Sequence, residues 1–567
     1  MKSGAEVFVD VLDEHHVNHV FVYPGGAIAF ILDEIKRRKR IKIINTRSDQ
    51  ATSLCADAYS RATDSVGICM ATSGPGATNL ITGIGNAYLD SIPMIAITGQ
   101  VKTHDLKGVK PIRQSGFQEL DIVSVVKPIT KWAITIKETN RIKYILNKAF
   151  DIAMDGRQGP VLLDIPMDIQ TNKAVQFDKF TAKKSLVELK EDLIKEAVLL
   201  ISKSKKPVLY VGGGVISANA SDALTKFAKK LSIPVATSLM GKGAFPEHNK
   251  LSLGMIGYVG SRACNFTISS ADLVIAIGAR FDVRATGSRT KTFAKNAKII
   301  HVDIDNCEIG NRVRADLKIN GDAKEFLEKI NKENIEIDTK EWLVQVDSWK
   351  KDYWYSYEKD KKVIKGQEVV EALSDLANGK WIVTADVGQN QMWVAQYFKF
   401  DKPRLHLSSG GSGCMGYGLP AAIAAKIAQP KTTVVNITGD GSFQMNIQEL
   451  ETIKYYKLPV KIIILNNHCL GLVRQFQEYV FDKRYTCTVD LYSSPNFTEI
   501  AKAYGIKSYN INNPSKLKET LKKAMKDPSA VVVNIDISRE EGVLPMLMGD
   551  KELYEQFPYI DYKPVPE

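Results

Sequence analysis

The sequence predicts an α/β protein made of three doubly wound domains, each built on a parallel sheet. Short apolar runs alternate with helical patterns along the whole chain, which is typical of parallel sheets covered by helices on both faces. The 567 residues exceed the size of one hydrophobic core, and three such blocks can be separated. Hydrophobic residues at 44% and charged residues at 25% are ordinary for a globular protein, so a large core is available.

The first block covers residues 1–170. It starts with an amphipathic helix, enters a further helix over residues 51–61, and closes with an apolar strand over residues 160–166. A polar, lysine-rich linker over residues 171–191 separates this block from the next.

The second block, residues 190–327, opens with a strand over residues 207–211 that runs into a glycine turn. Residues 328–365, rich in Lys, Glu, Trp and Tyr, are predicted to connect it to the third block as a helical segment. The third block covers residues 366–540. The three blocks share an architecture but no short-period sequence repeat.

Two strands of the third block end in polar motifs. Gly439-Asp440-Gly441-Ser442 follows the strand at residues 434–437, and Asn466-Asn467 follows the strand at residues 461–465. Glycine lets a backbone approach phosphate oxygens, while carboxylate and amide oxygens suit Mg²⁺. The motifs therefore predict a site for Mg²⁺ and diphosphate. The alternative is a strand-to-helix turn beside an unrelated loop, which the two strand contexts and their spacing disfavour.

The net charge of +12 comes mainly from scattered lysines. The basic run at residues 36–40 is predicted to be a solvated helix end. Because no basic stripe interleaved with aromatic residues accompanies it, nucleic acid is not expected as a partner. The charge favours anionic substrates.

Cysteine usage and the chain start predict a cytoplasmic protein. The seven cysteines are odd in number and contain no Cys-x-x-Cys pair, which favours reduced thiols over a disulfide framework or a zinc site. The first residues run straight into a helix, without a secretory or transit-peptide pattern. No stretch reaches the length of a membrane span, so no membrane partner is expected.

The Gly-Asp-Gly motif, followed some two dozen residues later by Asn-Asn, resembles the signature of the thiamin-diphosphate enzymes. Within that superfamily the chain is similar to the large subunit of the acetohydroxyacid synthase (acetolactate synthase) family, from about Val7 to about Asp536. The resemblance includes Tyr23-Pro24-Gly25-Gly26-Ala27 and residues 71–79, 240–246, 278–287 and 386–389. It implies a pyrimidine-binding first domain, a central domain of FAD type and a diphosphate-binding third domain.

The resemblance also implies residues for the cofactors. Asp440, Asn467 and the backbone carbonyl of Cys469 would bind Mg²⁺, and Met415 would hold the thiamin diphosphate in a bent conformation. Other residues of the cofactor cradle would be Gly388, Gln389, Asn390, Gly411, Ser412, Gly439, Gly441 and Ser442. The family often has His where this chain has Asn390.

Asp49 is the clearest departure from the family. Relatives place a Glu in Arg-His-Glu-Gln-Gly-Ala to move the proton that tautomerises the aminopyrimidine, and this chain has Arg47-Ser48-Asp49-Gln50-Ala51. The shorter side chain must bring its backbone closer or act through a water. The alternative is that Asp49 only favours the first turn of the helix. Gly25, Gly26, Phe117 and Gln118 match other residues of the reaction pocket.

Arg284 matches the arginine that recognises the carboxylate of the acceptor 2-keto acid, a role suited to a planar, bidentate side chain. Two features depart from the family: residues 107–115, before Phe117, and Phe476, where the biosynthetic enzyme typically carries Trp. FAD is expected in the central domain, with Gly212, Gly213, Gly278, Arg280 and Asp303 around it. The alternative role for Arg280 is an ion pair at the protein surface.

The resemblance implies a carboligase of branched-chain amino acid biosynthesis that decarboxylates pyruvate and transfers the two-carbon unit to a 2-keto acid. A related enzyme with another acceptor, a keto sugar or an aldehyde, is the first alternative. A cofactor-binding protein with weak or lost catalysis through Asp49 is the second. A homodimer or homotetramer is expected, with a small regulatory subunit as a possible partner, because family active sites lie between two chains.

Overall fold

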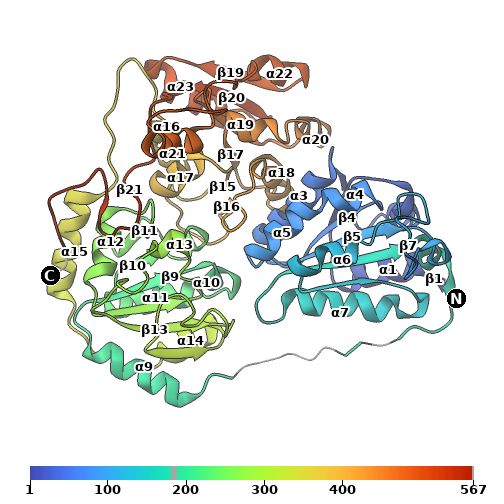
Figure 1. The fold of residues 1–567 in the computed structure, drawn as a ribbon, viewed down its shortest axis with the longest axis horizontal. Helices are drawn as coiled ribbons and strands as arrows, with labels where there is room; N and C mark the ends of the chain where they lie inside the picture. Colours follow the sequence, from blue (N-terminus) through green and yellow to red (C-terminus); the bar gives the residue numbers. More distant parts are fainter. Residues whose placement is uncertain (179, 182–187, 565–567) are drawn as a thin grey trace.

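The computed structural model describes residues 1–178, 180–181 and 188–564. Three six-stranded sheets, parallel throughout, carry helices on their faces (Figure 1). The predicted fold class, three doubly wound parallel-sheet domains, is therefore confirmed. Part of the expected linker, residues 179 and 182–187, lies outside the described residues.

The first sheet has the strand order β3-β2-β4-β5-β7-β6. The predicted strand at residues 160–166 is β7, and the predicted helix at residues 51–61 is α3, which begins two residues earlier, at Asp49. The strands are β2 (His19–Val22), β3 (Lys42–Asn45), β4 (Gly67–Ala71), β5 (Met94–Gln100), β6 (Trp132–Thr135) and β7 (Pro160–Pro166). The helices are α1 (Gly4–Glu14), α2 (Ala29–Arg38), α3 (Asp49–Thr63), α4 (Pro75–Asn79), α5 (Ile81–Leu89), α6 (Ile122–Val126), α7 (Ile142–Met154) and α8 (Met167–Thr171).

The second sheet has the order β11-β10-β9-β12-β13-β14. Its inner strand β9 is buried on both faces, which explains its unbroken apolar sequence. The strands are β9 (Pro207–Val211), β10 (Val235–Thr237), β11 (Ser252–Met255), β12 (Leu273–Ile277), β13 (Lys298–Asp303) and β14 (Leu317–Asn320). The helices are α9 (Glu191–Lys203), α10 (Gly213–Ser217), α11 (Ser221–Leu231), α12 (Arg262–Ser270), α13 (Val283–Thr286), α14 (Ala323–Ile330) and α15 (Lys340–Tyr353).

The third sheet has the order β16-β15-β17-β18-β20-β19. Its strands β17 and β18 are neighbours, and Gly439 pairs with Leu465, so their carboxyl ends lie side by side. The strands are β15 (Ile382–Ala385), β16 (His406–Ser408), β17 (Val434–Gly439), β18 (Lys461–Asn466), β19 (Lys507–Ile511) and β20 (Val531–Asp536). The helices are α16 (Gly366–Ala377), α17 (Gln389–Tyr397), α18 (Gly418–Ala428), α19 (Asp440–Gln444), α20 (Glu449–Tyr455), α21 (Gly471–Val480), α22 (Phe497–Ala503) and α23 (Leu517–Lys526).

Two short antiparallel ladders complete the fold. β1 (Lys2–Ser3) pairs with β8 (Lys173–Ala174), and β21 (Met546–Leu547) pairs with β22 (Gln556–Phe557). The second ladder belongs to the end of the chain, which leaves the third domain and packs on the middle domain: Leu553 joins the core of that domain, and Trp349 donates to the hydroxyl of Tyr562 over 2.7 Å.

The first and third domains share one hydrophobic core. Helices α3 and α18 pack against each other where the two domains meet, and Leu54, Ala58, Ala421 and Ala425 belong to a single buried cluster (Figure 1). Alanines on both helices allow close packing, and α18 is apolar almost throughout because it is covered on all sides. This shared core fixes the two domains relative to each other.

Three further findings concern the sequence predictions. The seven cysteines all lie in the described residues and form no disulfide there. Among the described residues, no helix has the length and apolarity needed to cross a membrane. The same part of the chain contains no cluster of three or more His, Cys, Asp or Glu side chains suited to a metal ion.

Candidate functional site

Asp440 and Asn467 lie at the neighbouring carboxyl ends of β17 and β18. Asp440 is the first residue of α19 and is 2% exposed, and Asn467 follows β18 directly. The Asn467 side-chain amide donates to Oε1 of Gln389 over 3.1 Å, and its Oδ1 accepts from the backbone N–H of Cys469 over 3.2 Å. These two hydrogen bonds fix the Asn467 side chain. Oδ1 has a second lone pair, so it is the atom of this side chain that can bind a metal ion. One carboxylate and one amide oxygen at adjacent strand ends fit Mg²⁺.

These residues line a cavity of about 180 Å³ at the end of the third sheet. Gly388, Gln389, Asn390, Met415, Gly439, Gly441, Ser442 and Cys469 also line it, whereas Gly411 and Ser412 do not. All of its lining residues, which lie between Val387 and Val473, belong to the third domain. The first domain contributes no wall to it.

The backbone around Gly388 explains two of the predicted residues. Gly388 has a φ of +146°, in the region that favours glycine, where β15 gives way to α17. The side-chain amide of the adjacent Asn390 donates to the carbonyls of Asp386 and Ile437. Asn390 therefore ties the turn to β17, and its amide hydrogens are already used inside the protein.

Asp386 supports the loop that carries Met415. Its buried carboxylate accepts from the backbone N–H groups of Gly416 over 2.9 Å and Gly418 over 3.0 Å, and burial raises its pKa to about 6. Met415 lies against the Gly-Asp-Gly turn, because a Cβ added to Gly441 would be 3.5 Å from its Cε. A bulky apolar side chain is thereby held in the cavity wall.

Tyr492 is a site residue that the sequence analysis missed. Its hydroxyl donates to Oδ2 of Asp440 over 3.0 Å, from a loop between α21 and α22. Burial raises the pKa of Asp440, and this hydrogen bond opposes the shift. No motif surrounds Tyr492, and only the fold brings it to Asp440, so no local signal pointed to it.

Asp49 is a buried carboxylate at the start of α3. Its Oδ2 accepts from the side-chain amide of Asn79 over 3.3 Å, while its Oδ1 is buried without a hydrogen-bond partner. Burial raises the pKa of Asp49. A Cβ added to Gly76 would lie 2.8 Å from Cγ2 of Thr72 and 3.3 Å from this Oδ1, so a larger residue there would crowd both side chains. An unpaired buried oxygen and a raised pKa are typical of a functional carboxylate. An acid that only stabilises the first turn of a helix can do so while exposed to water and does not need to be buried.

The remaining predicted residues line neither the third-domain cavity nor the cavity between the first and middle domains. Gly25 and Gly26 lie at the turn after β2, where a Cβ on Gly25 would clash with Thr72. Phe117 is 86% exposed and Phe476 is 53% exposed. Gln118 has a φ of +63° beside Gly74, and Arg284 lies exposed on α13. A single chain therefore does not bring the first-domain and third-domain residues into one cavity.

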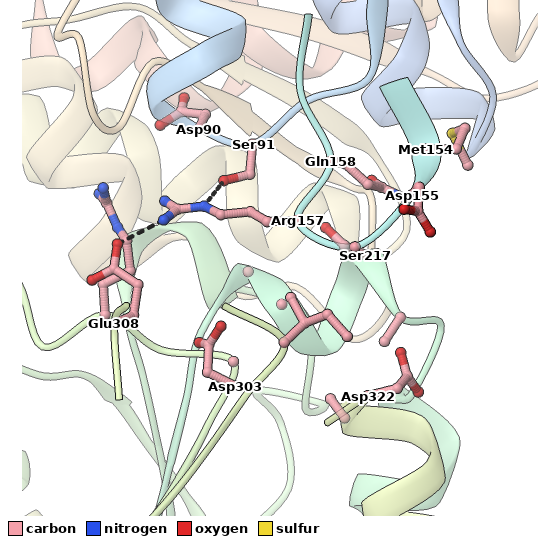
Figure 2. A pocket seen from close by; sticks show the side chains of 18 of the residues that line it. Asp90, Ser91, Met154, Asp155, Arg157, Gln158, Ser217, Asp303, Glu308 and Asp322 are labelled. Carbon is pink, nitrogen blue, oxygen red and sulfur yellow. Dashed lines mark hydrogen bonds and ion pairs between the residues drawn. The ribbon is translucent and has the colours of Figure 1, made fainter. Parts of the chain in front are cut away.

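A second cavity, of about 480 Å³, lies between the first and middle domains (Figure 2). Gly213, Gly278, Arg280 and Asp303 line it, whereas Gly212 does not. Gly278 has a φ of +55°, and a Cβ on it would clash with the backbone of Gly214. Two glycine turns at the ends of β9 and β12 thus meet at the cavity wall. The volume is that of a cofactor site.

Arg157 crosses this cavity from the first domain (Figure 2). Its guanidinium pairs with Asp305 at 2.9 Å and with Glu308 at 2.7 Å, and it donates to the hydroxyl of Ser91 over 2.9 Å. Burial raises the pKa of Asp303 to about 6. The sequence analysis missed Arg157, because its partners lie far away in the chain.

Comparison with known proteins matches three segments of the chain to one family. Residues 2–125 match the thiamine pyrophosphate enzyme N-terminal TPP binding domain, residues 194–330 the central domain, and residues 386–535 the C-terminal TPP binding domain. The chain therefore belongs to the thiamine pyrophosphate enzymes, and thiamine pyrophosphate (thiamin diphosphate) is its cofactor.

Its relatives define the branch of this family. Acetolactate synthase large subunits of Cyanidium caldarium and Haemophilus influenzae are each 41% identical, over 97% and 96% of this chain and 96% of each relative. The probable acetolactate synthase large subunit of Methanocaldococcus jannaschii is 43% identical over 96% of this chain and 93% of its own length. The chain is an acetolactate synthase-like enzyme of the thiamine pyrophosphate family, as the resemblance predicted.

Proposed function

We propose that the protein is a carboligase that decarboxylates pyruvate and transfers the two-carbon unit to a 2-keto acid, giving acetolactate when the acceptor is pyruvate. The observation that carries the proposal is the third-domain cavity, where Asp440, Asn467 and Met415 converge. The acetolactate synthase relatives, similar over nearly the whole chain, support the same reaction. They also favour an enzyme over a protein that only binds the cofactor.

Mg²⁺ and the diphosphate of the cofactor fit the third-domain cavity. Asp440, Asn467 and the carbonyl of Cys469 would hold the metal, and the glycine turns at Gly388 and Gly441 would let the diphosphate approach the backbone. When bound, the cofactor would supply a carbon nucleophile for attack on a 2-keto acid, whose carboxylate is then released as CO₂. The protein would supply the metal ligands and the apolar wall at Met415.

Asp49 would hold and move the proton that activates the cofactor. Its raised pKa and unpartnered Oδ1 favour this role, since a carboxyl group without a fixed partner can exchange a proton with a bound molecule. On the substrate side, Arg284 would bind the acceptor carboxylate. Its exposed position on α13 leaves the guanidinium available.

FAD fits the cavity between the first and middle domains. The glycine turns at Gly213 and Gly278 form a cradle that larger side chains would fill, and Arg280 would supply positive charge toward a diphosphate. Asp303 at the end of β13 suits a ribose hydroxyl. The flavin would have a structural role, because the proposed reaction involves no net redox change.

A homodimer would complete the active site. The third-domain cavity has no wall from the first domain, while Asp49 lies in a first-domain site away from that cavity. Large apolar side chains are exposed on both domains, among them Phe30, Phe117, Met445, Phe476 and Leu491. A second copy would bury such surfaces and bring Asp49 to the partner's cavity. A homotetramer, a small regulatory subunit and a cytoplasmic location are further expectations from the resemblance.

A different acceptor, a keto sugar or an aldehyde, is the second candidate. One structural feature favours it: the Glu119 carboxylate accepts from the backbone N–H groups of Lys107, Ser115 and Gly116, and so folds residues 107–115 into a defined loop beside Phe117. A loop so fixed at the predicted reaction pocket can select a larger acceptor.

The experiment is an incubation of the purified protein with thiamin diphosphate, Mg²⁺, FAD and pyruvate, with products followed by NMR. Acetolactate formation supports the synthase. Decarboxylation with little acetolactate, combined with a new product when a keto sugar or an aldehyde is added, supports the second candidate. Absence of pyruvate consumption with every acceptor contradicts both.

A further inference from the structure

One loop contacts residues that line each of the two cavities. Residues 409–417 connect β16 to α18, and Gly413 and Met415 in this loop line the third-domain cavity. On its other side, Asp90 from the first domain and Met240 from the middle domain pack on Gly410. Both Asp90 and Met240 line the cavity between the first and middle domains. All three domains therefore meet at this loop.

Asp90 holds the loop by its backbone. Its Oδ1 accepts from the N–H of Gly411 over 2.7 Å, and its Oδ2 accepts from the N–H of Gly410 over 3.1 Å. The carboxylate is fixed in turn by the buried Arg61, whose guanidinium is 2.8 Å away, and the Asp90 side chain is only 1% exposed. Charge-assisted bonds of this kind are about twice as strong as neutral ones, so they determine the path of the loop.

The packing around these bonds is tight. A Cβ added to Gly411 would lie 2.9 Å from Cβ of Leu89 and 3.0 Å from Oδ1 of Asp90. Further along the loop, the hydroxyl of Ser409 accepts from the N–H of Cys414 over 2.8 Å. A shift of the turn at Leu89 and Asp90 must therefore move the loop that leads to Met415.

We propose that Asp90 is a positioning residue that couples the two cavities: a ligand in the cavity between the first and middle domains fixes the Asp90 turn and thereby strengthens thiamin diphosphate binding next to Met415. This inference rests on the proposed FAD site. It gives FAD a function in a reaction without redox change. When FAD orders the Asp90 turn, less conformational entropy is lost on ordering the loop for thiamin diphosphate.

Coupling of this kind is reciprocal and measurable. If FAD raises the affinity for thiamin diphosphate by some factor, thiamin diphosphate raises the affinity for FAD by the same factor. Trp393 lines the third-domain cavity, so quenching of its fluorescence can report thiamin diphosphate binding. The Kd for thiamin diphosphate is measured at constant Mg²⁺, with and without saturating FAD, in the wild type and in variants.

For the wild type we expect FAD to tighten thiamin diphosphate binding at least about fivefold, the low end of typical coupling. Asp90→Asn places an amide group against two N–H donors. In this variant, FAD should raise the affinity for thiamin diphosphate less than about twofold. Gly411→Ala disturbs the same contact from the loop side without changing a charge, and should also lose the coupling. Asp151→Asn is the matched control: Asp151 lines the same cavity from α7, and its coupling factor should stay at the wild-type value.

The outcomes separate the inference from the proposed function. If a titration of the protein with FAD shows no saturable binding, both the FAD proposal and the coupling are wrong. If FAD binds but the wild-type factor is one, or if folded Asp90→Asn and Gly411→Ala both keep the wild-type factor, only the coupling is overturned. The inference is supported if both variants lose the effect of FAD on thiamin diphosphate affinity and Asp151→Asn keeps it.

Discussion

At the scale of single residues, the proposed reaction depends most on Asp49. It is one methylene shorter than the glutamate of the related family, yet it keeps the features of a proton-transfer group: burial, one unpaired oxygen and a raised pKa. We expect Asp49→Asn to lower kcat about a hundredfold or more, because the amide cannot take up a proton. Thiamin diphosphate affinity, measured by fluorescence on the same variant, should change much less.

Asp49→Glu distinguishes two views of this position. Asp49 is buried and its Oδ2 already accepts from Asn79, which favours a site fitted to the shorter acid, so we expect kcat to fall. Steady-state kinetics with pyruvate provide the measurement. A large gain in kcat would instead mean that the wild-type chain is a weakened catalyst.

Asp440 provides the residue-scale test of the metal site. Replacing it with Asn keeps the shape and the contact to Tyr492 but removes the negative charge that a divalent cation requires. We expect Asp440→Asn to weaken Mg²⁺-dependent thiamin diphosphate binding about a hundredfold, as measured by calorimetry with and without EDTA. Wild-type affinity in this variant would contradict the ligand assignment.

At the scale of secondary-structure elements, the sequence predicted what local patterns determine. The strand at residues 160–166 has its predicted bounds, and the two strands before Asp440 and Asn467 are neighbours in the sheet. Contacts between distant segments were not predictable, because no periodicity or motif encodes them. The contacts of Tyr492 with Asp440 and of Arg157 with Glu308 are of this kind. The amide of Asn390 likewise bonds to backbone carbonyls, which the motif alone could not reveal.

Asp164 on β7 makes the first sheet sensitive to pH. It is 1% exposed, accepts from Thr98, Gln100 and Thr135, and burial raises its pKa from 3.8 to about 6. Since the folded state binds this proton more tightly than the unfolded state, its stabilisation is full below pH 3.8 and is lost as the pH rises through about 6. The difference in free energy of unfolding between wild type and Asp164→Asn should therefore fall by about 2 kcal/mol between pH 4 and pH 7.

Urea titrations across this range measure that difference. Asp375→Asn, on the exposed face of α16, is the control and should show no such slope. A flat difference for Asp164→Asn would mean that Asp164 is ionised in the folded protein throughout.

At the scale of the whole molecule, the arrangement of the cavities is the main result. The first and third domains share a core through α3 and α18, yet Asp49 does not reach the cavity of its own chain's third domain. The middle domain contacts both and forms the second cavity. This arrangement supports the proposal that the chain is half of a symmetric enzyme in which each active site uses two copies.

Complementation between two inactive variants tests this central claim most directly. Asp49→Asn and Asp440→Asn are co-expressed with different affinity tags, and the mixed dimers are purified through both tags. One of the two sites in a mixed dimer then has both wild-type residues, so acetolactate-forming activity should return to about half of the wild-type value. Mixed dimers as inactive as either variant alone would contradict an active site shared between two chains.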